Sequence, residues 1–353
     1  MSQPSSDRPA GSAPNDGAAV GRTAADVNVT GGGAKPGAVT TAVPPGLPPF
    51  ASVLKSRDVE DPVNLWLHRP LAYAFVALIY RTSLTPNQVT ALSGLTGLVA
   101  AGCFVEGSRS AMVWGGALLW ASAILDGADG ILARAKRMFS ELGRALDGTA
   151  DAVVGIASVA GAAYHLWERG ASVALLVAMP LALGSAILHI YLYDYYKESF
   201  TLMTDARWDG VPLRRAEVRA RLARYRAERA SLPVLLASQL YVDLVSAQTA
   251  IVARTDPDGA REHLTFSVSD ASAALYRRHH RRLVKLWALI SLAPHTYTMA
   301  ICAMLDRLDV YVWLRLLLGN ALFVIALLWQ RRASSRTRRE LAALGLSPVA
   351  AAP

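Results

Sequence analysis

Apolar segments long enough to cross a bilayer dominate the sequence between residues 85 and 330. The chain has 353 residues, of which 53% are hydrophobic and only 18% charged, and its mean hydropathy is +0.28. Soluble proteins average about 25% charged residues, so this composition argues against an ordinary soluble domain. About 20 consecutive apolar residues span the hydrocarbon core as a helix. We predict six spans, over residues 85–105, 111–137, 141–167, 171–196, 283–305 and 310–329.

The segments outside these spans differ from them in composition. Residues 1–50 are mostly Gly, Ala, Pro, Ser and Thr, which bury too little apolar surface to fold, so we expect a disordered tail. Residues 51–84 predict a juxtamembrane amphipathic helix, because their apolar run is too short to span and Trp66, Arg69 and Tyr73 are typical interfacial anchors. The predicted fold is therefore all-α and polytopic, with six transmembrane helices in residues 85–330 and a basic cytoplasmic tail over residues 331–353.

A basic insertion over residues 197–280 separates the fourth predicted span from the fifth. It begins with an arginine-rich helical stretch that contains Arg219 and Arg226. The apolar stretch 233–253 that follows carries Gln239 and Asp243 on one helical face, which predicts an amphipathic cytoplasmic helix rather than a seventh span. Two roles for the arginine-rich helix stay open at this point: attraction to anionic lipids, or a solvated helix that only aids solubility.

The distribution of cationic residues predicts the orientation in the membrane. With six spans, the basic insertion, the Lys136–Arg137 turn and the basic tail all fall on one side, which the positive-inside rule assigns to the cytoplasm. We therefore expect an integral protein of a bacterial cytoplasmic membrane with both termini cytoplasmic. Arginine beside apolar segments fits this orientation better than a nucleic-acid surface. The only cysteines, Cys103 and Cys302, lie in apolar runs and form neither a disulfide framework nor a zinc site.

Four aspartates stand at the ends of the second and third predicted spans. Asp126 and Asp129 are three residues apart, and Asp147 and Asp151 are four apart, so each pair shares a helical face. Carboxylates within a membrane are costly and mark functional sites. Two such faces can converge, and the acids would then repel each other unless divalent cations neutralised them. Oxygen ligands suit Mg²⁺ or Mn²⁺, and a pair of such ions clamps phosphoryl oxygens.

Small residues accompany the aspartates on the second span. Gly127, Gly130 and Ala133 remove side-chain bulk beside the acids, and Arg134 adds a positive charge suited to a phosphate. A membrane cation transporter that uses Asp126 and Asp151 is the main alternative of another class. A transporter does not need small residues on the same face, so the pattern favours an enzyme that binds a nucleotide or diphosphate.

The complete pattern, Asp126-x-x-Asp129-Gly130-x-x-Ala133-Arg134, eight residues, then Gly143-x-x-x-Asp147-x-x-x-Asp151, resembles the signature of the CDP-alcohol phosphatidyltransferase family. The stretch Thr85-Pro86-Asn87-Gln88-Val89-Thr90 also resembles the start of that family's first span. The resemblance implies a six-helix membrane enzyme, usually a homodimer. Such an enzyme moves a phosphoalcohol from a CDP-alcohol to an acceptor hydroxyl and releases CMP.

The resemblance also implies roles for individual residues. Asp126, Asp129 and Asp147 would bind two metal ions, and Asp151 would both assist a metal and act as general base on the acceptor hydroxyl. The residues implied for the CDP pocket are Gly127, Gly130, Ala133, Arg134 and Gly143.

The acceptor is not specified by the motif. We expect CDP-diacylglycerol as donor and a small polar alcohol or polyol phosphate as acceptor, in phospholipid biosynthesis. The alternative is CDP-choline or CDP-ethanolamine acting on diacylglycerol. Arg144 and Asp194 are the candidate acceptor-binding residues. We expect His189 and His295 to be packing residues and Arg315 to snorkel to the outer interface.

Overall fold

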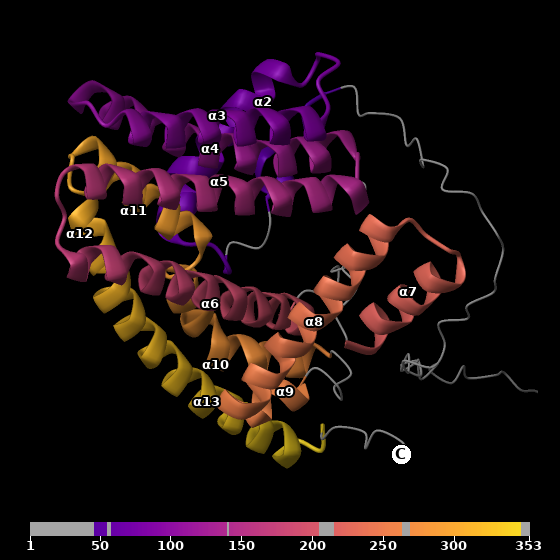
Figure 1. Ribbon diagram of the computed structural model, residues 1–353. Helices are drawn as coiled ribbons and strands as arrows, with labels where there is room; N and C mark the ends of the chain where they lie inside the picture. Colours follow the sequence, from indigo (N-terminus) through magenta and orange to yellow (C-terminus); the bar gives the residue numbers. More distant parts are fainter. Residues whose placement is uncertain (1–45, 55–57, 140, 205–214, 263–268, 347–353) are drawn as a thin grey trace, which may run out of the picture. The chain divides into compact units, whose positions relative to one another are not determined.

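The structure is a computed structural model that describes residues 46–54, 58–139, 141–204, 215–262 and 269–346. All regular elements in these ranges are helices (Figure 1). The predicted disordered tail lies outside the described residues up to residue 45. The all-α prediction is confirmed for the part of the chain that the structure describes.

The first four predicted spans correspond to helices α3 (Pro86–Glu106), α4 (Arg109–Lys136), α5 (Glu141–Glu168) and α6 (Val173–Thr204). Helix α3 begins with a capping box: the Gln88 N–H donates to Thr85 Oγ1, and the Thr85 N–H donates to Gln88 Oε1. It ends at Gly107, whose φ of 75° is left-handed, as helix ends commonly require. Local sequence therefore defines both ends of α3.

The last two spans are interrupted. The fifth consists of α10 (Asp270–Ala288) and α11 (Leu292–Met304), and the sixth of α12 (Leu308–Trp313), the π-helical segment η2 (Leu314–Gly319) and α13 (Asn320–Ala343). Pro294 explains the break before α11, because a proline ring clashes with the carbonyl four residues earlier, here that of Ile290. The fifth span starts earlier than predicted, and α13 continues through the first half of the predicted basic tail.

Seven helical segments in the described residues are long and apolar enough to cross a membrane, one more than the six predicted. The additional segment is Val234–Thr255, within α8 (Leu232–Thr255). Helices α7 (Arg215–Ala227) and α9 (Pro257–Glu262) stand on either side of it. The length and hydropathy of its helices thus make the chain a polytopic membrane protein. For α8 the two criteria disagree: its length and hydropathy fit a span, whereas the polar face with Gln239 and Asp243 predicts an amphipathic cytoplasmic helix.

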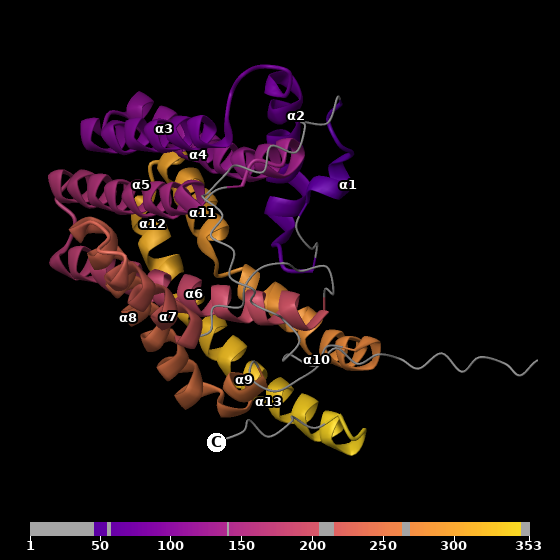
Figure 2. The same cartoon turned by 90° about the vertical axis from the view of Figure 1, so that its right-hand side faces the viewer.

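Helices α3, α4 and α5 run side by side in both views (Figures 1 and 2), and α11 packs on α4. Small residues on α3 allow close helix packing: a Cβ at Gly97 would lie 2.5 Å from Val154 Cγ1 of α5. Reciprocal hydrogen bonds of 2.9 Å link Ser93 and Ser122, each hydroxyl donating to the other residue's carbonyl. These contacts hold α3 against α4 one turn before Asp126.

The N-terminal described segment contains α1 (Phe50–Val53), the π-helical segment η1 (Asn64–His68) and α2 (Arg69–Ile79). Helix α2 packs on the motif end of α4, with Ala72 and Val76 buried against Ala128, Ile131 and Leu132. The predicted segment 51–84 therefore contains a helix that lies beside the motif end of α4, and its juxtamembrane position stays a prediction.

Candidate active site

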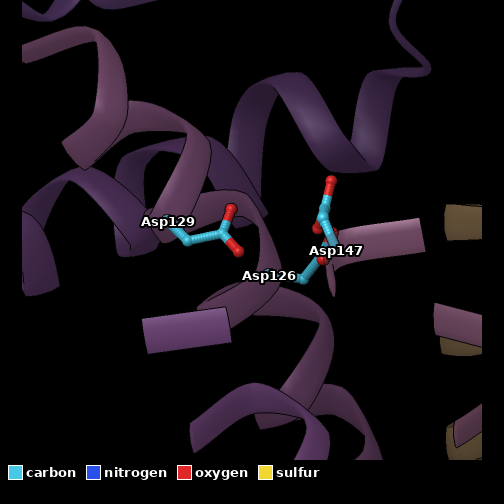
Figure 3. A group of neighbouring side chains, drawn as sticks. All are labelled: Asp126, Asp129 and Asp147. Atoms are coloured by element: carbon cyan, nitrogen blue, oxygen red, sulfur yellow. The ribbon is translucent and has the colours of Figure 1, made fainter. Parts of the chain in front are cut away.

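Three motif carboxylates converge between α4 and α5. Asp126 and Asp129 lie near the end of α4 and Asp147 lies in α5, and one oxygen from each falls within 4.8 Å of the others. Figure 3 shows Asp126 and Asp147 close together, with the carboxylate of Asp129 directed toward them. The predicted convergence of two aspartate faces is thus observed.

Asp129 is the most enclosed of the three. Its side chain accepts a hydrogen bond from the hydroxyl of Thr90 on α3, and both residues are buried. The fixed hydroxyl orients one carboxylate oxygen and leaves the other toward Asp126 and Asp147. Thr90 belongs to the sequence stretch that resembles the family's first span, so its position beside the motif gives that stretch a role in the site.

A pocket of about 390 Å³ opens beside the carboxylates. Of the predicted site residues, it is lined by Asp126, Gly127, Asp147, Asp151 and Asp194. Asp151 lies within hydrogen-bonding reach of Asp126. Lys197 lines the same pocket, and its Nζ is 2.5 Å from Asp194 Oδ1. Asp126, Asp147 and Asp151 therefore face one space that reaches Asp194 on α6.

Arg134 does not line this pocket in the described structure. Its Nε donates to the Val53 carbonyl at 2.5 Å, whereas its Nη2 is buried without a hydrogen-bond partner. A Cβ added at Gly130 would lie 3.4 Å from Arg134 Nη1, so this glycine leaves room for the guanidinium. Gly130, Ala133 and Gly143 are likewise absent from the pocket lining. The side chain of Arg144 lies outside the described residues.

Sequence reasoning missed a wall of the pocket that comes from the N-terminal segment. It is formed by Val59, Glu60, Asp61, Asn64, His68 and Arg69. Arg69 forms an ion pair with Glu60, 2.9 Å between Nη2 and Oε1, and its Nη1 donates to the Gly127 carbonyl at 3.3 Å. Arg69 is thus a pocket residue, and its prediction as an interfacial anchor is wrong. Arg69 and Glu60 are nine residues apart and do not share a helical face, so no local sequence pattern indicated their ion pair.

Burial shifts the pKa values of two titratable groups in this wall, Asp61 and His68. Burial raises the pKa of Asp61, assisted by the charge of Glu60 and opposed by the Asn64 N–H, which donates to Asp61 Oδ1 at 3.0 Å. Burial, together with the positive charge of Arg69, lowers the pKa of His68 to about 4. The His68 ring contacts Trp120 and Tyr297 edge-on. His68 is therefore neutral at physiological pH.

The pocket collects acidic groups in excess. Six carboxylates line it, those of Glu60, Asp61, Asp126, Asp147, Asp151 and Asp194, against the two cations Arg69 and Lys197, which leaves a formal charge of −4. Like charges this close cannot remain ionised in a partly desolvated site without counter-ions. The donor set is all oxygen, which suits hard divalent ions, and two of them would balance the formal charge.

Arg315 occupies a different place from the one predicted. It is buried, its Nη2 lies 3.1 Å from His189 Nδ1, and it donates to the Ile290 carbonyl that the Pro294 break leaves free. The snorkelling prediction is therefore wrong, because acceptors inside the bundle hold the guanidinium. His189 stacks on Phe323 as a packing residue, and His295 binds the Tyr311 hydroxyl at 2.6 Å, although it also lines the pocket.

A comparison with known families bears directly on this site. Residues 83–207 match the family model of CDP-alcohol phosphatidyltransferase, a range that contains helices α3–α6 and all four motif aspartates. A search of curated proteins found no match. The family match favours an enzyme over the cation transporter. Residues 83–207 are therefore a CDP-alcohol phosphatidyltransferase domain, and the protein is an integral membrane enzyme that transfers a group from a CDP-alcohol and releases CMP.

Proposed function

We propose that this enzyme transfers the phosphatidyl group of CDP-diacylglycerol to the hydroxyl of a small polar acceptor, as a step of phospholipid biosynthesis. One observation carries the proposal: three motif carboxylates lie within 4.8 Å of one another, and two of them, Asp126 and Asp147, line the same pocket as Asp151. This arrangement brings a site for divalent cations next to a carboxylate that can accept a proton.

The residues present fit a pair of divalent cations. Asp126, Asp129 and Asp147 would hold them, with Asp151 as a further ligand, and Mg²⁺ or Mn²⁺ suits this oxygen donor set. When bound, such ions neutralise the diphosphate and favour departure of the CMP phosphate. The acid excess in the pocket supports the proposal, since without cations the same carboxylates would repel a diphosphate.

The remaining chemistry belongs to side chains of this chain. Asp151 accepts the proton of the acceptor hydroxyl, whose oxygen then forms a bond to the phosphorus that carries the lipid alcohol. The bond from that phosphorus to the bridging oxygen breaks, and CMP leaves with the electron pair. General-base assistance of this kind contributes about 10²- to 10⁴-fold to the rate.

Arg69 and Arg134, with the glycines beside them, support binding of the CDP part of the substrate. Gly127 and Gly130 each border a guanidinium: a Cβ at Gly127 would lie 3.2 Å from Arg69 Nη1, and one at Gly130 would lie 3.4 Å from Arg134 Nη1. The partnerless Nη2 of Arg134 is a buried donor that suits a phosphate oxygen. We assign Gly127, Gly130, Ala133, Arg134 and Gly143 to the CDP side of the site.

Polar groups of α6 and α11 that line the pocket favour a small polar acceptor over diacylglycerol. They are Asp194, Lys197 and Thr296. These groups can bind hydroxyls or a phosphate of a polyol, whereas diacylglycerol presents one hydroxyl between two acyl chains. We assign Asp194 and Arg144 to the acceptor side. The alternative, CDP-choline or CDP-ethanolamine acting on diacylglycerol, reverses which substrate carries the lipid.

A CMP-release assay on the purified full chain tests the proposal. CDP-diacylglycerol, CDP-choline and CDP-ethanolamine are each combined with a panel of polyols, polyol phosphates and diacylglycerol. Release of CMP from CDP-diacylglycerol that increases with one small polar acceptor supports the proposal. Release only from CDP-choline or CDP-ethanolamine with diacylglycerol would establish the alternative.

Three further assignments complete the proposal. We place the protein in a bacterial cytoplasmic membrane with both termini and the aspartates on the cytoplasmic side, since the basic segments gather there and CDP-alcohols carry a cytoplasmic nucleotide. We also propose a homodimer, on the family resemblance alone. Cross-linking in native membranes and protease protection of the termini test these assignments.

A further inference from the structure

Helices α7 and α8 form a hairpin in the insertion between α6 and α10. Val218 and Leu222 of α7 are buried against Val242 and Val245 of α8. A chain of hydrogen bonds runs along one edge of this contact: Arg226 Nη2 donates to Gln239 Oε1 at 2.9 Å, and Gln239 Nε2 donates to Asp243 Oδ1 at 3.0 Å. The two helices therefore form one packed unit.

This packing argues against a transmembrane position for α8. The contact falls in the middle of Val234–Thr255, the segment that meets the length and hydropathy of a span. If α8 crossed the bilayer, the exposed carboxylate of Asp243 and the arginines of α7 would lie near the centre of the hydrocarbon. Charged groups at that depth are strongly disfavoured.

The contacts of α8 with the rest of the bundle point to the same conclusion. Gln248 Nε2 donates to the Tyr191 carbonyl at 2.7 Å, in the turn of α6 that precedes Asp194. Asp256, directly after α8, accepts a hydrogen bond of 2.7 Å from Ser334, beyond the end of the sixth predicted span. In both views α8 is steeply inclined to α3–α5 (Figures 1 and 2). The hairpin is thus attached at the end of the bundle that carries the aspartate site.

The hairpin exposes an apolar face and a cationic face beside it. Leu236, Leu240 and Leu244 follow each other at four-residue spacing and are 62%, 61% and 46% exposed. Arg219 and Arg226 are seven residues apart and share one side of α7. Because Arg226 binds Gln239 at the border of the leucine face, this side of α7 adjoins the leucines. Leucines beside guanidinium groups complement a membrane surface that is apolar below and anionic above.

We propose that the α7–α8 hairpin lies on the anionic cytoplasmic surface of the membrane, with the leucines of α8 in the acyl boundary and Arg219 and Arg226 at the lipid phosphates. The inference does not depend on the transferase reaction. For the arginine-rich helix, the proposal favours attraction to anionic lipids over a solvated helix that only aids solubility. It also places α8 at the membrane interface instead of across the bilayer.

Depth-dependent quenching tests this placement. Cys103→Ala and Cys302→Ala remove the native thiols, and Leu240→Cys is labelled with an environment-sensitive fluorophore. The full chain is reconstituted into phosphatidylcholine vesicles with or without about 30% phosphatidylglycerol. Lipids with a nitroxide near the headgroup or at the chain end serve as quenchers. A label at position 95, on the exposed face of α3 near its middle, is the bilayer-spanning control.

The expected result is quenching at position 240 mainly by the shallow nitroxide, stronger with phosphatidylglycerol, while position 95 is quenched mainly by the deep nitroxide. Arg219→Gln should weaken the association of the hairpin with the lipid surface about fivefold, as measured by the quenching at position 240. Arg224→Gln, on the opposite side of α7, should change this association less. Stronger quenching by the deep nitroxide at position 240 would overturn the proposal in favour of a span. Absence of quenching in both vesicle types would overturn it in favour of a solvated or protein-covered hairpin.

Discussion

Two clusters of polar side chains in this protein differ in where their hydrogen-bonding groups find partners. The first cluster consists of Asp126, Asp129 and Asp147, whose carboxylates face one another, and Asp129 also accepts a hydrogen bond from the Thr90 hydroxyl. The second group, which we call the Asp256 cluster, consists of Asp256, His280, Gln330, Ser334 and Thr337, between the end of α8 and helices α10 and α13.

The Asp256 cluster is closed by its own hydrogen bonds. Asp256 accepts from the Ser334 hydroxyl at 2.7 Å and from the Gly259 N–H at 3.1 Å, and Gln330 donates to Ser334 at 3.2 Å. His280 bonds Thr337 at 3.0 Å. Asp256 does not line the pocket that Asp126, Asp147 and Asp151 share. The difference teaches that Asp256 is satisfied by donors of the protein itself, whereas Asp126, Asp129 and Asp147 bring their oxygens together in a group that could hold a metal ion.

Removal of divalent cations should have the largest effect. Excess chelator should abolish CMP release, because the carboxylates of the pocket would then repel the diphosphate of the substrate. Readdition of Mg²⁺ or Mn²⁺ should restore the activity. Undiminished CMP release in chelator would contradict the metal site and remove the main contrast with the Asp256 cluster.

Asp151→Asn should lower the turnover number by about 10²- to 10⁴-fold, because an amide cannot accept the acceptor's proton. CDP binding, measured by calorimetry, should persist, since Asp126, Asp129 and Asp147 remain. Asp270→Asn is the control, at an exposed position in the first turn of α10. Near wild-type turnover in Asp151→Asn would refute its role as general base.

Arg69→Gln should raise the KM for the CDP-alcohol about 10- to 100-fold, as expected for the loss of a charge-assisted hydrogen bond near a phosphate. The change also releases Glu60 and the Gly127 carbonyl from their present donor. Steady-state kinetics give the result, and Arg81→Gln, at an exposed position, is the control. An unchanged KM would show that the N-terminal wall only encloses the pocket.

Ser334→Ala tests the other member of the comparison. It removes the hydroxyl that binds Asp256, so the free energy of unfolding should fall by about 1–3 kcal/mol. Turnover per folded molecule should not change, because the cluster does not border the aspartate pocket. Thermal unfolding in detergent and the CMP-release assay measure the two quantities. A loss of turnover with unchanged stability would assign the Asp256 cluster to function.

His68 gives the smallest expected effect, a change in the pH dependence of stability. Its pKa is lowered to about 4 by burial and by Arg69, so the neutral ring stabilises the fold at pH above about 6.5, the unfolded value. That contribution is lost as the pH falls from about 6.5 toward 4. The drop in unfolding temperature between pH 7.5 and pH 5 should therefore be smaller for His68→Asn than for the wild type. An equal drop would show that His68 is not buried as neutral imidazole.

Local patterns were sufficient for much of the fold and for the core of the site. The apolar segments predicted helices α3–α6 closely, and the spacing of three and four residues between aspartates predicted their shared faces, because helical periodicity is a property of adjacent turns. The Thr85 capping box is likewise local. The motif aspartates that border the pocket, Asp126, Asp147 and Asp151, were all recognisable from sequence.

Long-range contacts decided the rest. The sequence by itself determined an all-helical membrane protein with a CDP-alcohol phosphatidyltransferase motif at one end of two spans. Only the tertiary structure brought Arg69 and Glu60 to the pocket, turned Arg315 inward to the Ile290 carbonyl, and packed α7 along the middle of α8. The physical reason is that an ion pair or a helix contact depends on which elements lie side by side in the folded chain. Neither residue type nor local spacing predicts this arrangement.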